Sequence, residues 1–109
     1  MDLNELEHFG RKLLVALEPV RRLPVNKVMS LFAVAMKEGL TVDDYAKRAG
    51  ISPTTMSRHL LDLGDIDRGM QPGLGLVTGR TNVTNQREKV YALTPKGRAL
   101  VTKVAGALR

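Results

Sequence analysis

Residues 41–63 read TVDDYAKRAGISPTTMSRHLLDL, and this stretch predicts two short helices separated by one tight turn. Thr41 is suited to cap the start of the first helix, and Asp44 stands three positions later, where a capping box places its acceptor. Gly50 is expected to end that helix, because glycine tolerates the left-handed conformation found at helix ends. Ser52 offers a second cap, followed by a proline at the first helical position, where its missing N–H costs nothing.

The apolar residues of this stretch fall on one face of each helix at helical spacing. They are Tyr45, Ala46 and Ala49 in the first helix, Ile51 in the turn, and Met56, Leu60 and Leu63 in the second. The two faces can close a small core, as in a helix-turn-helix, whose second helix lies in the major groove of DNA. The opposite face of the second helix presents hydrogen-bonding groups: Thr54, Thr55, Ser57, Arg58 and Asp62. An ordinary helical hairpin with a solvated face is the alternative. Because the turn, the caps and the polar face agree, we favour a helix that recognises DNA.

The composition indicates one small domain whose positive charge lies in its C-terminal half. The chain has 109 residues, 4% aromatic residues and no cysteine, which excludes disulfides and thiolate metal sites. Residues 1–46 carry six Lys or Arg and seven Asp or Glu, whereas residues 47–103 carry ten and four, within a net charge of +6. This asymmetry favours attraction to phosphates. Neither a signal peptide nor a long apolar run is visible, so we expect a cytoplasmic protein.

Two helices are expected before this stretch, over residues 2–18 and 25–38. The first carries a leucine stripe, which packs either on its own domain or on a second copy of the chain. The pair Arg21–Arg22 that follows it either touches the DNA backbone or, as we favour, belongs to a solvated linker. The second helix is apolar on more than one side, so we expect it to be buried at the centre, with Met29 and Met36 filling the core.

The segment after the helix-turn-helix is rich in glycine and then predicts a β-hairpin and a last helix. Strands are expected over residues 74–78 and 89–93, with a polar turn between them. A hairpin directly after a helix-turn-helix is a wing, and an exposed loop is the alternative. Polar residues that can contact phosphate or the minor groove gather at its tip: Arg80, Asn82, Thr84, Asn85, Gln86 and Arg87. The last helix is expected over residues 95–108, with Thr94 as its cap.

From residue 23 to about residue 100 the sequence resembles the MarR-like family of bacterial winged-helix transcriptional regulators. The matching pieces are Leu23–Pro24, TVDDYA at 41–46, SPTTMSR at 52–58, and a family pattern beyond the wing that aligns with residues 85–97. Together they cover roughly two thirds of the chain. The combination is more specific to this family than the helix-turn-helix alone.

The expected fold class is α+β and mostly helical, a single winged-helix domain over residues 1–109. Its parts are a dimerisation helix and linker at 1–22, the winged helix-turn-helix at 23–93 with the wing at about 74–93, and a C-terminal helix at 94–109. The resemblance implies a homodimer on a pseudo-palindromic operator in double-stranded DNA, with half-sites about 34–36 Å apart. Since one helix follows the wing where the family usually has two, we expect the first and last helices to form a weak interface.

The resemblance also implies that Arg87 enters the minor groove. The family usually has Asp at position 85, where it forms an ion pair with this arginine. Asn85 carries no charge, so here it would hold Arg87 through a neutral hydrogen bond. From the helix pattern, Arg58 is the best candidate for a bidentate contact with guanine, and His59 is expected to be partly buried and hydrogen-bonded. The predicted DNA-binding residues are Ser52, Thr54, Thr55, Ser57, Arg58, Arg80, Asn85, Arg87 and Lys89, with Lys47 and Arg48 as further backbone contacts.

No catalytic, cofactor or metal site is predicted. The two histidines, His8 and His59, fall on different predicted helices, and Asp65 and Asp67 lack EF-hand spacing. We therefore expect a sequence-specific transcriptional regulator, most often a repressor by resemblance, and no enzyme. The alternatives are an architectural DNA binder and a winged-helix module that binds protein. The family often senses phenolic or aromatic ligands, which leaves open a small-molecule effector of unknown identity.

Overall fold

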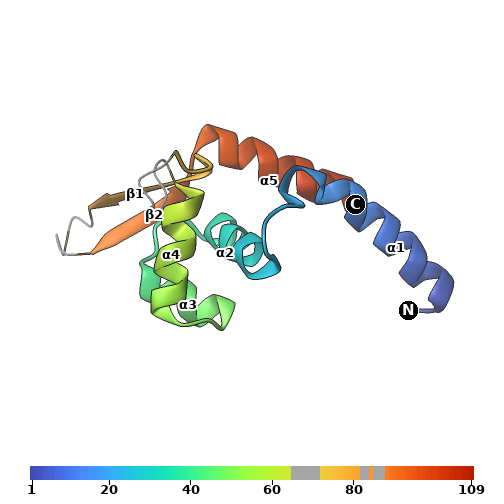
Figure 1. Ribbon diagram of the computed structural model, residues 1–109, viewed down its shortest axis with the longest axis horizontal. Coiled ribbons are helices and arrows are strands. Elements are labelled where there is room, and N and C mark those ends of the chain that lie inside the picture. The colour runs from blue at the N-terminus through green and yellow to red at the C-terminus, as the bar shows by residue number, and fades with distance from the viewer. Residues whose placement is uncertain (65–71, 82–83, 85–87) are drawn as a thin grey trace.

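The N-terminal helix and the β-hairpin occupy opposite ends of an elongated molecule that measures 51 × 27 × 22 Å (Figure 1). The computed structural model describes residues 1–64, 72–81, 84 and 88–109. Its helices are α1 (Leu3–Ala16), the 3-10 helix η1 (Glu18–Val20), α2 (Val25–Met36), α3 (Val42–Ala49), α4 (Pro53–Leu63) and α5 (Pro95–Ala107). Its strands are β1 (Val77–Thr81) and β2 (Lys89–Leu93).

The helix-turn-helix is confirmed with the boundaries that the sequence predicts. Thr41 Oγ1 accepts a hydrogen bond from the Asp44 backbone N–H at 3.3 Å, and Asp44 Oδ2 accepts one from the Thr41 N–H at 3.5 Å. These reciprocal bonds form the expected capping box of α3. Gly50 ends α3 with φ of +71°, a left-handed conformation that favours glycine.

The core lies where α2, α3 and α4 meet the base of the hairpin. Its buried residues are Leu31, Val34, Tyr45, Ala46, Met56, Leu60, Leu63, Leu76, Val77 and Leu93. The predicted role of Met29 and Met36 as core filler is wrong, because these side chains are 50% and 79% exposed. Each stands two positions from a buried residue of α2, and two helical positions turn a side chain by about 200°. Met29 therefore points away from Leu31, and Met36 away from Val34.

The N-terminal helix is shorter than predicted and lies mostly outside the core. It ends at Ala16, and Pro19 then stands near the start of η1, where a residue without an N–H is tolerated. Within this chain α1 contacts η1 and α5, and Ala16 is its one buried residue. Leu3 and Leu14 are 82% and 75% exposed, so most of the apolar surface of α1 remains uncovered in the monomer.

The hairpin is antiparallel, with a register that runs from Val77 opposite Leu93 to Thr81 opposite Lys89. The second strand matches the prediction, but the first is shifted from 74–78 to Val77–Thr81. The preceding residues are used elsewhere, because the backbone N–H of Leu76 bonds to the Leu63 carbonyl at the end of α4, at 2.8 Å. An isolated bridge pairs Leu40 with Tyr91, which connects β2 to the turn between α2 and α3.

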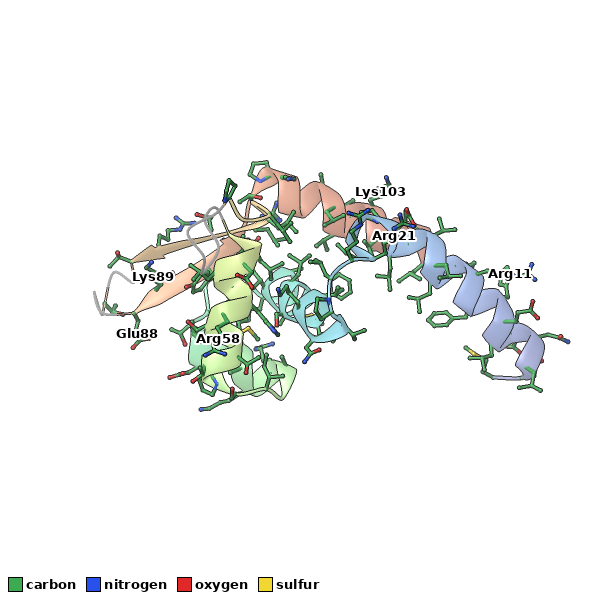
Figure 2. The ribbon with its side chains drawn as sticks, viewed as in Figure 1. Arg11, Arg21, Arg58, Glu88, Lys89 and Lys103 are labelled. Carbon is green, nitrogen blue, oxygen red and sulfur yellow. The ribbon has the colours of Figure 1, made fainter. Side chains whose placement is uncertain are left out.

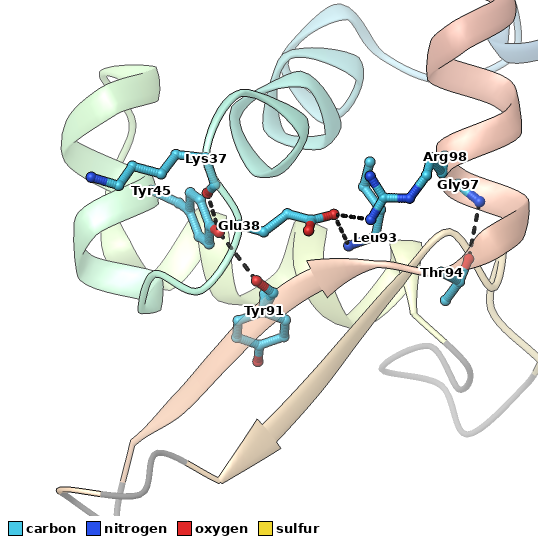
Figure 3. Close-up of polar contacts among 8 residues, drawn as sticks. All are labelled: Lys37, Glu38, Tyr45, Tyr91, Leu93, Thr94, Gly97 and Arg98. Atoms are coloured by element: carbon cyan, nitrogen blue, oxygen red, sulfur yellow. Dashed lines mark hydrogen bonds and ion pairs between the residues drawn. The ribbon is translucent and has the colours of Figure 1, made fainter.

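Side-chain hydrogen bonds join the helices to the base of the hairpin (Figure 3). Glu38 Oε1 accepts from the Leu93 backbone N–H at 3.1 Å and from the Arg98 guanidinium on α5 at 2.7 Å. Buried Tyr45 donates its hydroxyl to the Lys37 carbonyl at 2.7 Å. Thr94 caps α5 as predicted, since its Oγ1 accepts from the Gly97 N–H at 3.0 Å. These bonds fix α3, β2 and α5 relative to one another.

Candidate nucleic-acid interface

Helix α4 has one buried face and one exposed face, as its sequence predicts. Met56, Leu60 and Leu63 are at most 1% exposed, and they hold the helix against the core. Thr54, Ser57 and Arg58 are exposed on the outer side. An α-helix repeats every 3.6 residues, so positions 54, 57, 58 and 61 form one outward stripe. This stripe is the surface that a major groove would meet first.

Ser52 and Thr55 stabilise the start of α4 in addition to lying near that stripe. Ser52 Oγ accepts from the Thr55 backbone N–H at 3.1 Å and donates to Thr55 Oγ1 at 2.9 Å. Ser52 is exposed and Thr55 is half-buried. Their hydroxyl groups therefore form the hydrogen bonds that cap the first turn of the helix. Among the predicted DNA-binding residues of α4, Thr54, Ser57 and Arg58 have the polar groups that this cap does not use.

Asp62 does not belong to the outward face on which the sequence pattern places it. Its Oδ2 lies 3.0 Å from Lys27 Nζ on α2, and the two side chains are only 14% and 15% exposed. Next to it, His59 is partly buried, and its Nδ1 lies 2.9 Å from Ser30 Oγ, which confirms the predicted hydrogen bond of this histidine. Both contacts attach α4 to α2 and fix the depth at which the helix sits.

The wing brings Lys89 to the same side of the molecule as α4, whereas Arg80 pairs with Val90 in the register and lies on the opposite face of the hairpin. Arg80 on β1 and Lys89 at the start of β2 are both exposed. Figure 2 shows Lys89 on the hairpin beside α4, which carries Arg58. Asn85 and Arg87 lie outside the described residues, so their predicted contacts with the minor groove stay predictions.

Two other basic pairs differ in their distance from this surface. Lys47 and Arg48 are exposed in the last turn of α3, the helix that packs on α4. Arg21 lies near the junction of α1 and α5, away from Arg58 and Lys89 (Figure 2), and its guanidinium is 3.5 Å from the Glu18 carboxylate. The position of Arg21 agrees with the interpretation of this segment as a linker.

Two further residues stand at the candidate interface that the sequence pattern did not single out. Leu61 is 46% exposed and completes the outward stripe of α4, a position that the 3–4 residue spacing from Arg58 could have revealed. Tyr91 stands opposite Gly79 in the hairpin, and its ring lies so close that a Cβ on Gly79 would be 2.9 Å from Cε1. Burial raises the pKa of Tyr91 above its ordinary value, because the charged form would lose solvation.

A cavity of about 490 Å³ lies where η1, the residues before β1 and the first turns of α5 meet. Its walls include apolar Val20, Leu76 and Leu100, with Lys96 among its polar residues. The small-molecule effector that the resemblance leaves open stays a prediction. Within the described residues, no group of three His, Cys, Asp or Glu side chains could hold a metal, and no helix has the length and apolarity to cross a membrane.

Comparison with known proteins shows what this architecture is similar to. No family model matches the chain, and no curated protein matches it in sequence. Among solved structures it is similar to RV1404 from Mycobacterium tuberculosis, with a TM-score of 0.76, 19% identity, and coverage of 97% of this chain and 65% of that one. It is similar to a MepR mutant from S. aureus bound to an oligodeoxyribonucleotide, with a TM-score of 0.72, 23% identity, and coverage of 94% and 70%.

A third similar structure carries the family name in its description. It is a MarR-family transcriptional regulator from Silicibacter pomeroyi, with a TM-score of 0.66, 24% identity, and coverage of 95% of this chain and 64% of that one. The chain thus spans about two thirds of the length of the structures that it matches. It has the winged-helix fold of the MarR-family transcriptional regulators.

Proposed function

We propose that this chain is a sequence-specific double-stranded DNA-binding transcriptional regulator, acting as a repressor, that places α4 in the major groove. The observation that carries this proposal is the stripe of Thr54, Ser57 and Arg58, exposed on a helix whose opposite face is fully buried. The same fold holds an oligodeoxyribonucleotide in the MepR mutant. Arg80 and Lys89 on the wing, with Lys47 and Arg48 on α3, would contact the backbone on either side.

The proposal is tested by fluorescence-anisotropy titrations of the purified protein against two labelled duplexes at two salt concentrations. One duplex is the DNA upstream of its own gene, and the other is a scrambled copy. We expect binding to the first to be tighter by about a thousandfold or more at the higher salt. Equal and salt-sensitive binding to both duplexes would favour an architectural protein. Binding to neither would favour a module that binds protein.

Arg58→Ala should weaken binding to the preferred duplex by about 1–3 kcal/mol and relax selectivity at one base pair, because a guanidinium can donate two hydrogen bonds to guanine. Arg58→Lys is the matched control: it keeps the positive charge but lacks the planar pair of donors, so it should also lose selectivity. Titrations with duplexes substituted at single base pairs measure both effects. If both variants lost equal affinity for preferred and scrambled DNA, Arg58 would be a phosphate contact.

We infer that the chain forms a homodimer through α1 and α5. Leu3, Leu6 and Leu14 on α1 are 82%, 53% and 75% exposed, and no other described residue of the chain covers them. A contiguous apolar surface of this kind usually marks an interface. In a twofold arrangement the α1 stripe of one copy would meet the same elements of the other. Such pairing would also present two copies of α4 to the two halves of an operator.

Leu14→Glu should shift the chain from dimer to monomer, because a carboxylate would replace apolar surface within the proposed interface. Met36→Glu is the matched control, since Met36 is equally exposed at 79% but lies on α2. Equilibrium sedimentation at high protein concentration measures the mass, and circular dichroism checks that both variants fold. A dimer that survives Leu14→Glu, or one that Met36→Glu dissociates equally, would contradict this interface.

A further inference from the structure

A groove of about 230 Å³ separates α4 from the wing. Leu61 forms part of its helix side, while Lys89 and Tyr91 form part of its wing side. Leu61 also belongs to the outward stripe of α4 that contains Arg58. The groove therefore opens directly beside the surface proposed to read bases.

The wing side of this groove presents two polar groups on the same face of β2. Residues two positions apart in a strand point to the same side, so Lys89 and Tyr91 lie next to each other there. Figure 3 shows the Tyr91 ring on the side of β2 away from Tyr45. Gly79 on the paired strand leaves room for the ring, since any Cβ there would overlap it.

Within the described residues, these two side chains have no partners that would occupy their polar groups. In the part of the chain that the structure describes, the Lys89 ammonium makes no ion pair and the Tyr91 hydroxyl makes no hydrogen bond. A tyrosine hydroxyl is protonated at neutral pH, and burial raises the pKa of Tyr91 further. Each group can thus donate to an acceptor that enters from outside, and an ammonium beside a neutral hydroxyl selects an anion.

The geometry of DNA identifies this anion. The major groove and the adjacent minor groove are separated by one sugar–phosphate strand. If α4 enters the major groove and the wing reaches the minor groove, that strand must cross the space between α4 and the hairpin. A single strand carries one negative charge for about every 3.4 Å of helix axis, so a phosphate is within reach of a group placed there.

We propose that the groove beside Leu61, Lys89 and Tyr91 holds the sugar–phosphate strand that separates the two DNA grooves. Lys89 pairs with one phosphate, the Tyr91 hydroxyl donates to a phosphate oxygen, and Leu61 packs against the deoxyribose. This inference rests on the proposed function, and it adds a backbone subsite to which Tyr91 and Leu61 belong. The subsite fixes how deeply α4 enters the major groove, without reading any base itself.

The first test compares Lys89→Ala and Tyr91→Phe with the unchanged protein on the tightest-binding duplex and on its scrambled copy. Each variant should weaken binding to both duplexes by the same factor, about tenfold for Lys89→Ala and less for Tyr91→Phe, because the contact is with backbone. Lys37→Ala is the matched control, since it removes an equal charge from an exposed lysine at the end of α2, outside both the groove and the proposed dimer interface, and should leave affinity unchanged. Urea unfolding should give the same midpoint for all four proteins.

The second test locates the phosphate. Each duplex carries one neutral methylphosphonate in each half-site, at symmetric positions. A series of such duplexes, with the substitution moved one phosphate at a time, is titrated with the protein. At the position between the α4 and wing contacts, neutralisation should weaken the unchanged protein about tenfold and should have no further effect on Lys89→Ala. The subsite would be overturned if neutralisation and Lys89→Ala gave additive losses of affinity at every position. It would also be overturned if neutralisation changed the affinity of neither the unchanged protein nor Lys89→Ala. Both outcomes would leave DNA binding intact. Absence of binding to any duplex would instead overturn the proposed function, and the subsite with it.

Discussion

Gly97→Ala is expected to lower the free energy of unfolding by about 3 kcal/mol, through overpacking at the start of α5. Gly97 is buried, and a Cβ at this position would overlap the Leu76 carbonyl group. Leu76 cannot move away easily, because its N–H bonds to Leu63 and its carbonyl accepts from the Thr94 N–H. Relief of the overlap would therefore require α4, the hairpin and α5 to move relative to one another. Urea unfolding followed by circular dichroism measures the loss.

Gly106→Ala is the matched control for this prediction. It makes the same change in the same helix, but nothing lies within 4 Å of the added Cβ. Alanine is the better helix former, so this variant should be more stable by about 0.5–1 kcal/mol. Opposite signs for the two substitutions would establish close packing as the cause. If both variants were stabilised, α5 would not lie against Leu76 in solution.

Leu60→Ala is expected to cost about 2–5 kcal/mol of stability, since it removes most of a fully buried side chain from the core. Leu60 is 1% exposed and packs among the residues that join α4 to α2 and α3. Thermal and urea unfolding give the size of the loss. DNA affinity of the remaining folded protein should change little, because Leu60 points away from the outward stripe.

Leu61→Ala makes the same chemical change one position along the helix and serves as the control. Leu61 is 46% exposed, so its truncation should change stability by no more than about 0.5 kcal/mol. The two neighbouring leucines should thus separate stability from DNA binding. Equal losses of stability in both variants would mean that α4 is rotated relative to the orientation described above.

The helix-turn-helix could be predicted from the sequence because its determinants are local. The bonds between Thr41 and Asp44 and the cap at Ser52 each span three residues, and Gly50 ends a helix through its own conformation. Residues this close in sequence determine their structure with little help from the rest of the chain. The spacing of Leu60 and Leu63 identified the buried face for the same reason.

The features that the sequence did not reveal depend on contacts between distant residues. The first strand starts at Val77 because Leu76 bonds back to the end of α4, which no strand pattern encodes. Asp62 looked like a surface acid, but Lys27, 35 residues earlier, pairs with it. The position of Tyr91 at the candidate interface depends on the hairpin register, which places it opposite Gly79. Such pairings require the tertiary fold.

The ion pair between Lys27 and Asp62 has a consequence for how DNA binding would respond to salt. Proteins displace condensed counterions from DNA when their cations neutralise phosphates, and the slope of log affinity against log salt concentration counts these events. Lys27 is already neutralised inside the protein, with both partners largely buried, so it releases no counterion. The slope should consequently follow surface groups such as Lys89 and Arg80 rather than the net charge of +6. Ion pairs inside the protein thereby limit how many counterions one bound protein molecule can displace from DNA.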